Sequence, residues 1–148
     1  MPHSLCSLHT HVVFSTKDRL PTIHDEFRSD LFAYLGGIVR GLDGKAVIIN
    51  GMRDHVHMLI KLSATLAVAD CMRFVKANSS KWLRQNGHPK FAWQNGYAAF
   101  SVSTSNLPHV TNYIREQERH HRRMSFQQEL VRLLEKHGVI YHERYLWR

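Results

Sequence analysis

The sequence has little cysteine and no long apolar segment. Cys6 and Cys71 lie far apart and lack the close spacing of metal-binding cysteines, so we expect free thiols in a reducing cytosol. No apolar stretch approaches the length that spans a bilayer, and residues 1–6 lack the charged segment and apolar core of a signal peptide. These absences argue against a disulfide-stapled or membrane protein and predict a soluble, cytoplasmic one.

Acidic residues are scarce relative to basic ones. Twelve Asp and Glu stand against 20 Lys and Arg, which gives a formal net charge of +8. This excess indicates a polyanionic partner such as nucleic acid. The 148 residues contain no repeat, low-complexity tract or linker, and a chain of this length can bury a core without staples. We therefore expect one domain over residues 1–148.

Hydrophobic periodicity and turn residues predict an alternation of strands and helices. We expect strands over 8–16, 45–49, 55–60 and 97–103, and helices over 24–40, 65–84, from Pro108 through Gln117, and from 125 to a stop at Gly138. Asn50-Gly51 suits a hairpin turn between the second and third strands, and Ser125 and Gln128 form a capping box. The order βαββαβ predicts an α+β fold: a ferredoxin-like antiparallel sheet with helices on one face plus C-terminal helices.

Two short patterns place reactive side chains together. His55 and His57 are two residues apart in a strand, so both imidazoles face one side. Tyr113 and Gln117 are four apart in the expected helix and share a face. Two imidazoles and an amide oxygen leave positions open on a divalent cation, as catalytic metal sites require, and the phenol is a candidate nucleophile.

A second His-x-His pair competes with the first. Twelve histidines among 148 residues give roughly one such pair by chance, and His9-Thr10-His11 also begins an apolar run. Its spacing is the same, although its middle residue is polar. For His55 and His57, the alternative to a metal site is a pair of partly buried, hydrogen-bonded strand histidines.

Taken together, these residues resemble the HUH-type single-tyrosine transposases of insertion sequences and the related REP-associated tyrosine transposases. His55-Val56-His57 matches the family's two histidines around a hydrophobic residue, with Asp54 before them, and Tyr113 and Gln117 match its Y-x-x-x-Q motif. Further similarity covers, in the family's order, residues 11–17, 76–81 and 93–97. The resemblance favours His55 and His57 over the earlier pair.

The resemblance implies that Tyr113 is the catalytic nucleophile and that His55, His57 and Gln117 bind a divalent metal, Mg²⁺ or Mn²⁺. It implies nicking and strand transfer on single-stranded DNA through a 5′-phosphotyrosine, and hence DNA transposition. The expected partners are single-stranded DNA with hairpin ends and a second copy of the chain. In that homodimer the tyrosine helix of one subunit would dock on the histidine strand of the other, with the polar stretch 101–108 allowing the exchange.

Basic and hydroxyl side chains in two segments are candidates for phosphate contacts. They are Arg73, Lys76, Ser79, Ser80, Lys81 and Arg84 on the long helix, and Arg119, His120, Arg122 and Arg123 after the tyrosine. A solvated helix face would explain the first group equally well. Trp82 and Trp93 could stack on unpaired bases or belong to the core.

Three other functions fit parts of the pattern. The chain could be a non-catalytic nucleic-acid-binding module on the same ferredoxin-like sheet, with structural histidines. It could be a zinc hydrolase using His55, His57 and a third histidine, although it has no H-E-x-x-H motif. Within the favoured class, it could be a domesticated nuclease that serves the host.

Overall fold

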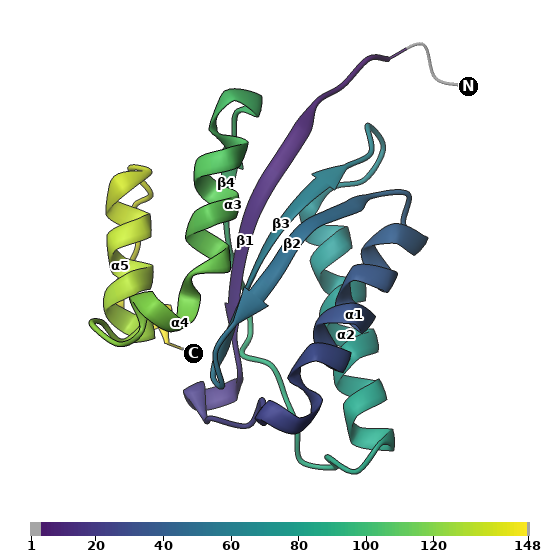
Figure 1. Ribbon diagram of the computed structural model, residues 1–148, viewed down its shortest axis with the longest axis vertical. Helices are drawn as coiled ribbons and strands as arrows, with labels where there is room; N and C mark the ends of the chain where they lie inside the picture. Colours follow the sequence, from purple (N-terminus) through teal and green to yellow (C-terminus); the bar gives the residue numbers. More distant parts are fainter. Residues whose placement is uncertain (1–3, 148) are drawn as a thin grey trace.

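A computed structural model describes residues 4–147 and contains one four-stranded antiparallel sheet (Figure 1). The strands are β1 (Leu8–Ser15), β2 (Lys45–Gly51), β3 (His55–Leu62) and β4 (Ala98–Val102), in the spatial order β2-β3-β1-β4. The helices are α1 (Asp25–Gly41), α2 (Val68–Gln85), α3 (Leu107–Arg115), α4 (Gln117–His120), α5 (Phe126–Lys136) and α6 (Glu143–Leu146), with 3₁₀ turns η1 (Lys17–Arg19) and η2 (Thr104–Asn106). This arrangement confirms the predicted α+β, ferredoxin-like fold.

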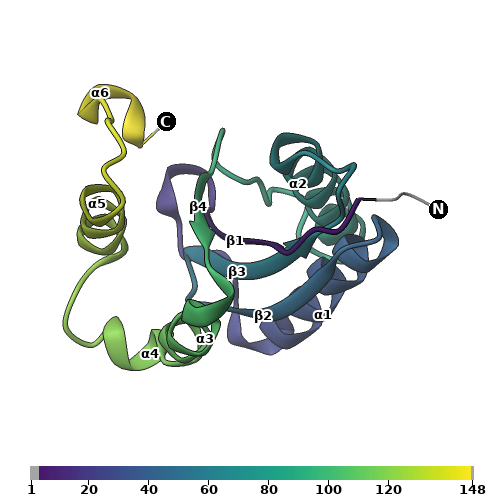
Figure 2. The same cartoon turned by 90° about the horizontal axis from the view of Figure 1, so that it is seen from above.

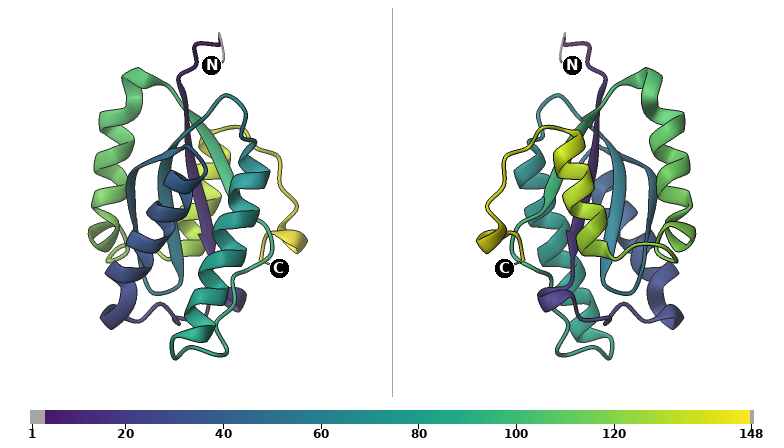
Figure 3. Two further views of the ribbon diagram at one scale, coloured as in Figure 1. Left: turned by 90° about the vertical axis from the view of Figure 1, so that its right-hand side faces the viewer. Right: turned by 90° about the vertical axis from the view of Figure 1, so that its left-hand side faces the viewer.

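The helices divide between the two faces of the sheet. Helices α1 and α2 cover one face, and α3, α4 and α5 lie on the other (Figure 2). Because successive strand residues point to opposite sides, Val12 and Phe14 of β1 pack with α1 and α2, whereas Val13 between them packs with α5. On this second face α3 contacts β2 and β3, while α5 lies against β1 and β4 (Figure 3).

The hairpin between β2 and β3 turns later than predicted. Asn50 pairs with His57 and Gly51 with Val56, so the turn falls at residues 52–54 and the prediction of an Asn50-Gly51 turn was wrong. Gly51 serves a different purpose, since a Cβ there would lie 2.2 Å from the backbone oxygen of His55. Glycine therefore permits the close approach of the two strands at the point where the histidine strand begins.

The predicted single helix from Pro108 through Gln117 was also wrong. Helix α3 ends at Arg115, Glu116 has non-helical dihedral angles (φ −98°, ψ 29°), and α4 begins at Gln117. The side-chain amide of Asn50 donates to the carbonyls of Ile114 (2.9 Å) and Arg115 (3.1 Å). A continuous helix would bond those carbonyls to amides four residues on, so β2 supplies the partner that ends α3.

The last long helix follows the sequence signals closely. Ser125 Oγ accepts from the backbone of Gln128 (3.2 Å) and the Gln128 side chain accepts from the backbone of Ser125 (3.0 Å), which confirms the capping box. Helix α5 ends at Lys136, and Gly138 has a positive φ of 66°. Among residues 4–147, no helix has the length and apolar character needed to cross a bilayer.

We predict that Gly51→Ala destabilises the protein by about 1–3 kcal/mol or more, since the added methyl group would overlap the His55 backbone. Urea unfolding measures the change. Gly41→Ala is the matched control, because nothing lies within 4 Å of a Cβ at Gly41 and alanine suits a helix end. Equal stability of the Gly51→Ala variant and the unchanged protein would contradict the close approach.

Candidate active site

The two histidines of β3 face α4 and α5, and both side chains are fully buried. As the strand period predicts, they project from the same side of the sheet, with ring centroids 5.2 Å apart. Val56 between them belongs to the core under α1 and α2. The strand thus presents two imidazoles to one site and anchors itself from the other face.

His55 is held between acceptor groups. Its Nδ1 lies 2.7 Å from the Asp54 carboxylate and its Nε2 lies 3.0 Å from Gln117 Oε1. A carboxylate only accepts, so Nδ1 carries the hydrogen, and in a neutral ring Nε2 would direct a lone pair at the Gln117 oxygen. Burial lowers the pKa of His55, but hydrogen bonds to Asp54 and Glu129 outweigh it and raise the pKa to about 9. The position therefore favours a positive charge.

His57 lies between an imidazole and a carboxylate. Its Nδ1 is 2.8 Å from His11 Nε2, and its Nε2 is 2.9 Å from Glu129 Oε1. Burial lowers the pKa of His57, and burial together with the nearby His57 lowers the pKa of His11 to about 3. Both rings are therefore neutral in this arrangement, and a single hydrogen lies between His57 Nδ1 and His11 Nε2. His9, the other member of the competing pair, does not contact this cluster.

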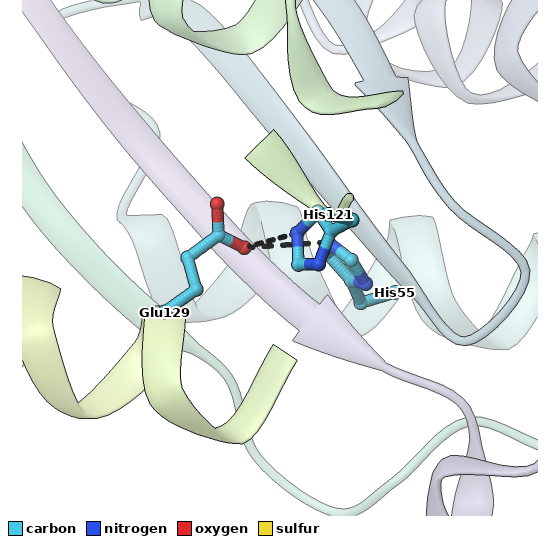
Figure 4. A group of neighbouring side chains, drawn as sticks. All are labelled: His55, His121 and Glu129. Carbon is cyan, nitrogen blue, oxygen red and sulfur yellow. Dashed lines mark hydrogen bonds and ion pairs between the residues drawn. The ribbon is translucent and has the colours of Figure 1, made fainter. Parts of the chain in front are cut away.

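Glu129 of α5 occupies the centre of the site and is only 1% exposed. Its Oε1 lies 3.0 Å from His121 Nε2 and 3.4 Å from His55 Nε2 (Figure 4), and its Oε2 accepts from the amide of Gln117 at 3.0 Å. Burial raises the pKa of Glu129, but hydrogen bonds from His121, His55 and His57 outweigh it and hold the pKa well below its ordinary value. The carboxylate is therefore ionised.

Tyr113 of α3 donates its hydroxyl hydrogen to Glu129 Oε2. Its ring lies 6.0 Å from that of His57 and stacks on His120 at 4.6 Å. Burial and the negative charge of Glu129 hold the pKa of Tyr113 above its ordinary value. The phenol is therefore protonated here, with an acceptor already bound to its hydrogen.

The donor atoms fit a divalent cation. Gln117 Oε1 lies 3.0 Å from His55 Nε2 and 3.1 Å from His121 Nε2. The distances from Glu129 Oε1 to the Nε2 atoms of His57, His121 and His55 are 2.9, 3.0 and 3.4 Å. An octahedral ion with bonds of 2.0–2.1 Å separates adjacent ligands by about 2.9 Å. The Nδ1 atoms of His55 and His57 also have partners of their own, the usual second-sphere arrangement for histidines that bind metal through Nε2. His55, His121 and Glu129 could hold a metal ion.

The structure brings together all four residues predicted for chemistry: His55, His57, Tyr113 and Gln117. Sequence reasoning missed His121, Glu129 and the supporting role of His11. Glu129 had a signal, because it lies on the buried face of α5 with Phe126, Leu130 and Leu133, where an acid is out of place. His121 lies four residues beyond Gln117, the spacing that already paired Gln117 with Tyr113.

The predicted DNA contacts on α2 lie on the opposite face of the sheet from this site (Figure 2). Ser79 and Ser80 are buried and donate to carbonyls of their own helix, so neither hydroxyl faces solvent. Lys76 donates to the carbonyls of Gln94 and Gly96. Three cations point outward: Arg73, Lys81 and Arg84.

The two tryptophans belong to the packing. Trp93 is buried and donates to Ser79 Oγ at 2.9 Å, while Trp82 stacks on Tyr34 with centroids 4.5 Å apart.

The predicted contacts after the tyrosine lie closer to the site. His120 packs on the Tyr113 ring. Arg119 pairs with Glu116 at 2.8 Å and Arg122 approaches Glu118 at 3.8 Å, while Arg123 is exposed.

One chain assembles the whole cluster. Helix α3 packs on β2 and β3 of its own sheet and is bonded there by Asn50. Tyr113 and His57 of the same chain contact the two oxygens of one carboxylate. The expected docking of α3 on a partner subunit is therefore not required to complete the site in this structure.

Two solved transposase structures have the same fold. The chain superimposes on a Deinococcus radiodurans R1 protein classed as a transposase with a TM-score of 0.61 and 22% identity, over 79% of this chain and 95% of that one. It also superimposes on a REP-associated tyrosine transposase bound to a REP hairpin, with a TM-score of 0.62 and 13% identity, over 82% of this chain and 72% of that one. At these identities the likeness establishes the fold.

Sequence comparison identifies the family. Residues 4–117 match the family model of the IS200-like transposases. The chain is 26% identical over 124 residues to the transposase for insertion sequence element IS200 of Salmonella typhimurium (strain LT2) and to that of Salmonella typhi, covering 79% of this chain and 81% of either relative. The chain therefore belongs to the IS200-like transposase family, whose members are enzymes that act on DNA.

We predict that His57→Ala weakens Mn²⁺ binding strongly, because it removes a donor atom from the cluster. His11→Ala should weaken it roughly 10–100-fold, as expected for a residue that orients a ligand. Isothermal titration calorimetry measures both. His9→Ala is the matched control and should change nothing, since His9 lies outside the cluster; a loss as large as that of His57→Ala would show that the wrong pair has been assigned.

Proposed function

We propose that this transposase nicks and rejoins single-stranded DNA through a covalent 5′-phosphotyrosine on Tyr113, with the help of a divalent cation. One observation carries the proposal. The hydroxyl of Tyr113 and Nε2 of His57 contact the two oxygens of Glu129, so the nucleophile and the metal-binding groups meet at one point. The family match supports transposition as the process that this chemistry serves.

His55, His57 and Gln117 would hold the cation, Mg²⁺ or Mn²⁺, and Glu129 and His121 contribute further donors. The bound ion would withdraw negative charge from a nonbridging phosphate oxygen during attack. Asp54 and His11 contact the Nδ1 atoms of His55 and His57 and so fix the orientation of these two imidazoles.

Tyr113 supplies the covalent step. Its oxygen attacks phosphorus, the new O–P bond forms, and the bond from phosphorus to O3′ breaks. The phenolic hydrogen leaves through Glu129 Oε2, its present acceptor, and passes on to water, because the lowered pKa of Glu129 disfavours its protonated form. The released O3′ takes a proton from water, so the step is balanced. The products are a 5′-phosphotyrosine and a free 3′-hydroxyl. Another 3′-hydroxyl can reverse the step and join strands, since the energy of the ester bond is retained.

The substrate and the assembly belong to the same proposal. We infer a single HUH domain over residues 1–148 that acts on single-stranded DNA with hairpin ends. Binding of a REP hairpin by the structurally similar tyrosine transposase supports the hairpin, and the net charge of +8 supports a polyanionic substrate. A homodimer stays a prediction.

We predict that the protein, mixed with Mn²⁺ and a DNA hairpin bearing single-stranded arms, forms a DNA adduct that survives denaturing electrophoresis. Tyr113→Phe should abolish the adduct, because it removes only the nucleophilic oxygen. Tyr97→Phe is the matched control, since Tyr97 is exposed and is not among the side chains that hydrogen-bond to Glu129. An undiminished adduct from Tyr113→Phe refutes the assignment. Chelator-resistant binding with no adduct from the unchanged protein would favour a non-catalytic module.

The in-chain site makes a prediction about mixed assemblies. Co-expression of His57→Ala and Tyr113→Phe chains with different tags should give no adduct, because every site keeps one defect. Double-tag purification verifies that mixed dimers are present. Recovery of activity would instead show that the tyrosine helix is exchanged between subunits, as the resemblance implied. The absence of mixed dimers would refute the homodimer.

A further inference from the structure

A cleft between α3 and α5 opens directly beside Tyr113. Its cavity volume is ≈ 160 Å³, which is below the roughly 300–1,000 Å³ of small-molecule pockets. Tyr113, His11 and Glu129 lie at its inner end, and β4 contributes Ser101 and Val102. The cleft therefore connects the proposed nucleophile to solvent.

The outer wall of this cleft carries unpaired positive charge. Arg132 and Lys136 line it from α5 and are exposed. Among residues 4–147, neither forms an ion pair. The two cations are available to an anion that approaches Tyr113.

Three charged side chains of α5 follow one another along the cleft, from its buried end to solvent. Glu129, Arg132 and Lys136 are three and then four residues apart, so they share one face of the helix. Glu129 belongs to the metal cluster, and the two cations follow it outward. Helix α5 also lies beyond residues 4–117, the part of the chain that matches the family model.

The cluster has a second opening, whose charge is different. That cleft reaches Asp54 and His121 and is lined by two arginines and three acids: Arg28, Arg53, Asp25, Asp54 and Glu118. Arg53 and Arg28 both pair with Asp25, at 2.9 and 3.5 Å. Two arginines against three acids give these five side chains a net charge of −1, so a polyanion is attracted to the α3–α5 cleft and not to this one.

We propose that the α3–α5 cleft binds the DNA strand next to the bond that Tyr113 attacks, with Arg132 and Lys136 contacting its phosphates. This inference rests on the proposed function and specifies the path of its substrate. The single-stranded arm runs along α5 away from Glu129. Contacts of this kind position the backbone without reading sequence.

The test is noncovalent binding, measured by fluorescence anisotropy in the Tyr113→Phe background over a range of salt concentrations. The probes are a hairpin with single-stranded arms and the same hairpin without arms. The double substitution Arg132→Gln with Lys136→Gln should reduce the salt slope for the armed hairpin by about 1.4, since each single-strand phosphate contact contributes about 0.7. Binding of the armless hairpin should not change.

The matched control is Arg40→Gln with Lys45→Gln, which removes the same charge from exposed positions on α1 and β2. Thermal melting verifies that both double variants fold. An unchanged slope in the α5 variant, an equal loss in the control, or an equal loss for the armless hairpin each overturns the inference. Adduct formation by chains that retain Tyr113 is scored separately, so a failure of the proposed chemistry can be distinguished from a failure of the cleft.

Discussion

The buried carboxylate of Glu129 is the interaction on which the rest of the site depends. An ionised group removed from water costs several kcal/mol unless its oxygens are compensated. Here the two oxygens contact His57, His121, Gln117 and Tyr113. Those partners come from β3, α3, α4 and the segment after α4, so one carboxylate fixes the relative positions of elements that are distant in the sequence. Each partner is in turn oriented by a second contact, such as that of His57 with His11.

The same cluster has too many acceptors for its hydrogens. His55 Nε2 faces both Gln117 Oε1 and Glu129 Oε1 while its Nδ1 is committed to Asp54. The raised pKa of His55 shows that a proton relieves this conflict. A divalent cation relieves it more completely, because it binds the lone pairs of the imidazole, the amide and the carboxylate together. The surplus of lone pairs is therefore the physical reason to expect a metal here. The family's motif of two histidines is a second and separate reason.

Local periodicity predicted much of the fold, and the family resemblance selected four residues of the site: His55, His57, Tyr113 and Gln117. The two-residue period put His55 and His57 on one face, and the capping box at Ser125 placed the start of α5. Failures arose wherever a distant residue decided the outcome. The break after Arg115 depends on Asn50, 65 residues away along the chain, and no local pattern contains that contact. For the same reason the sequence did not reveal that the hydroxyls of Ser79 and Ser80 are buried, since helical spacing does not say which face of a helix the sheet covers.

Helix α5 contributes both to the stability of the fold and to the candidate active site. Phe126, Leu130, Leu133 and Leu134 attach it to Val13 and Phe100 of the sheet, and burial of such side chains contributes about 1.5–3 kcal/mol each. That anchoring holds Glu129 in the cluster against its desolvation cost. The polar edge of the same helix carries Arg132 and Lys136 beside the cleft. One rigid helix thus supplies the apolar anchor, the central carboxylate and the unpaired cations. Any displacement of α5 therefore moves two things at once: the carboxylate that accepts the Tyr113 hydrogen, and the positive charges that line the cleft leading to Tyr113.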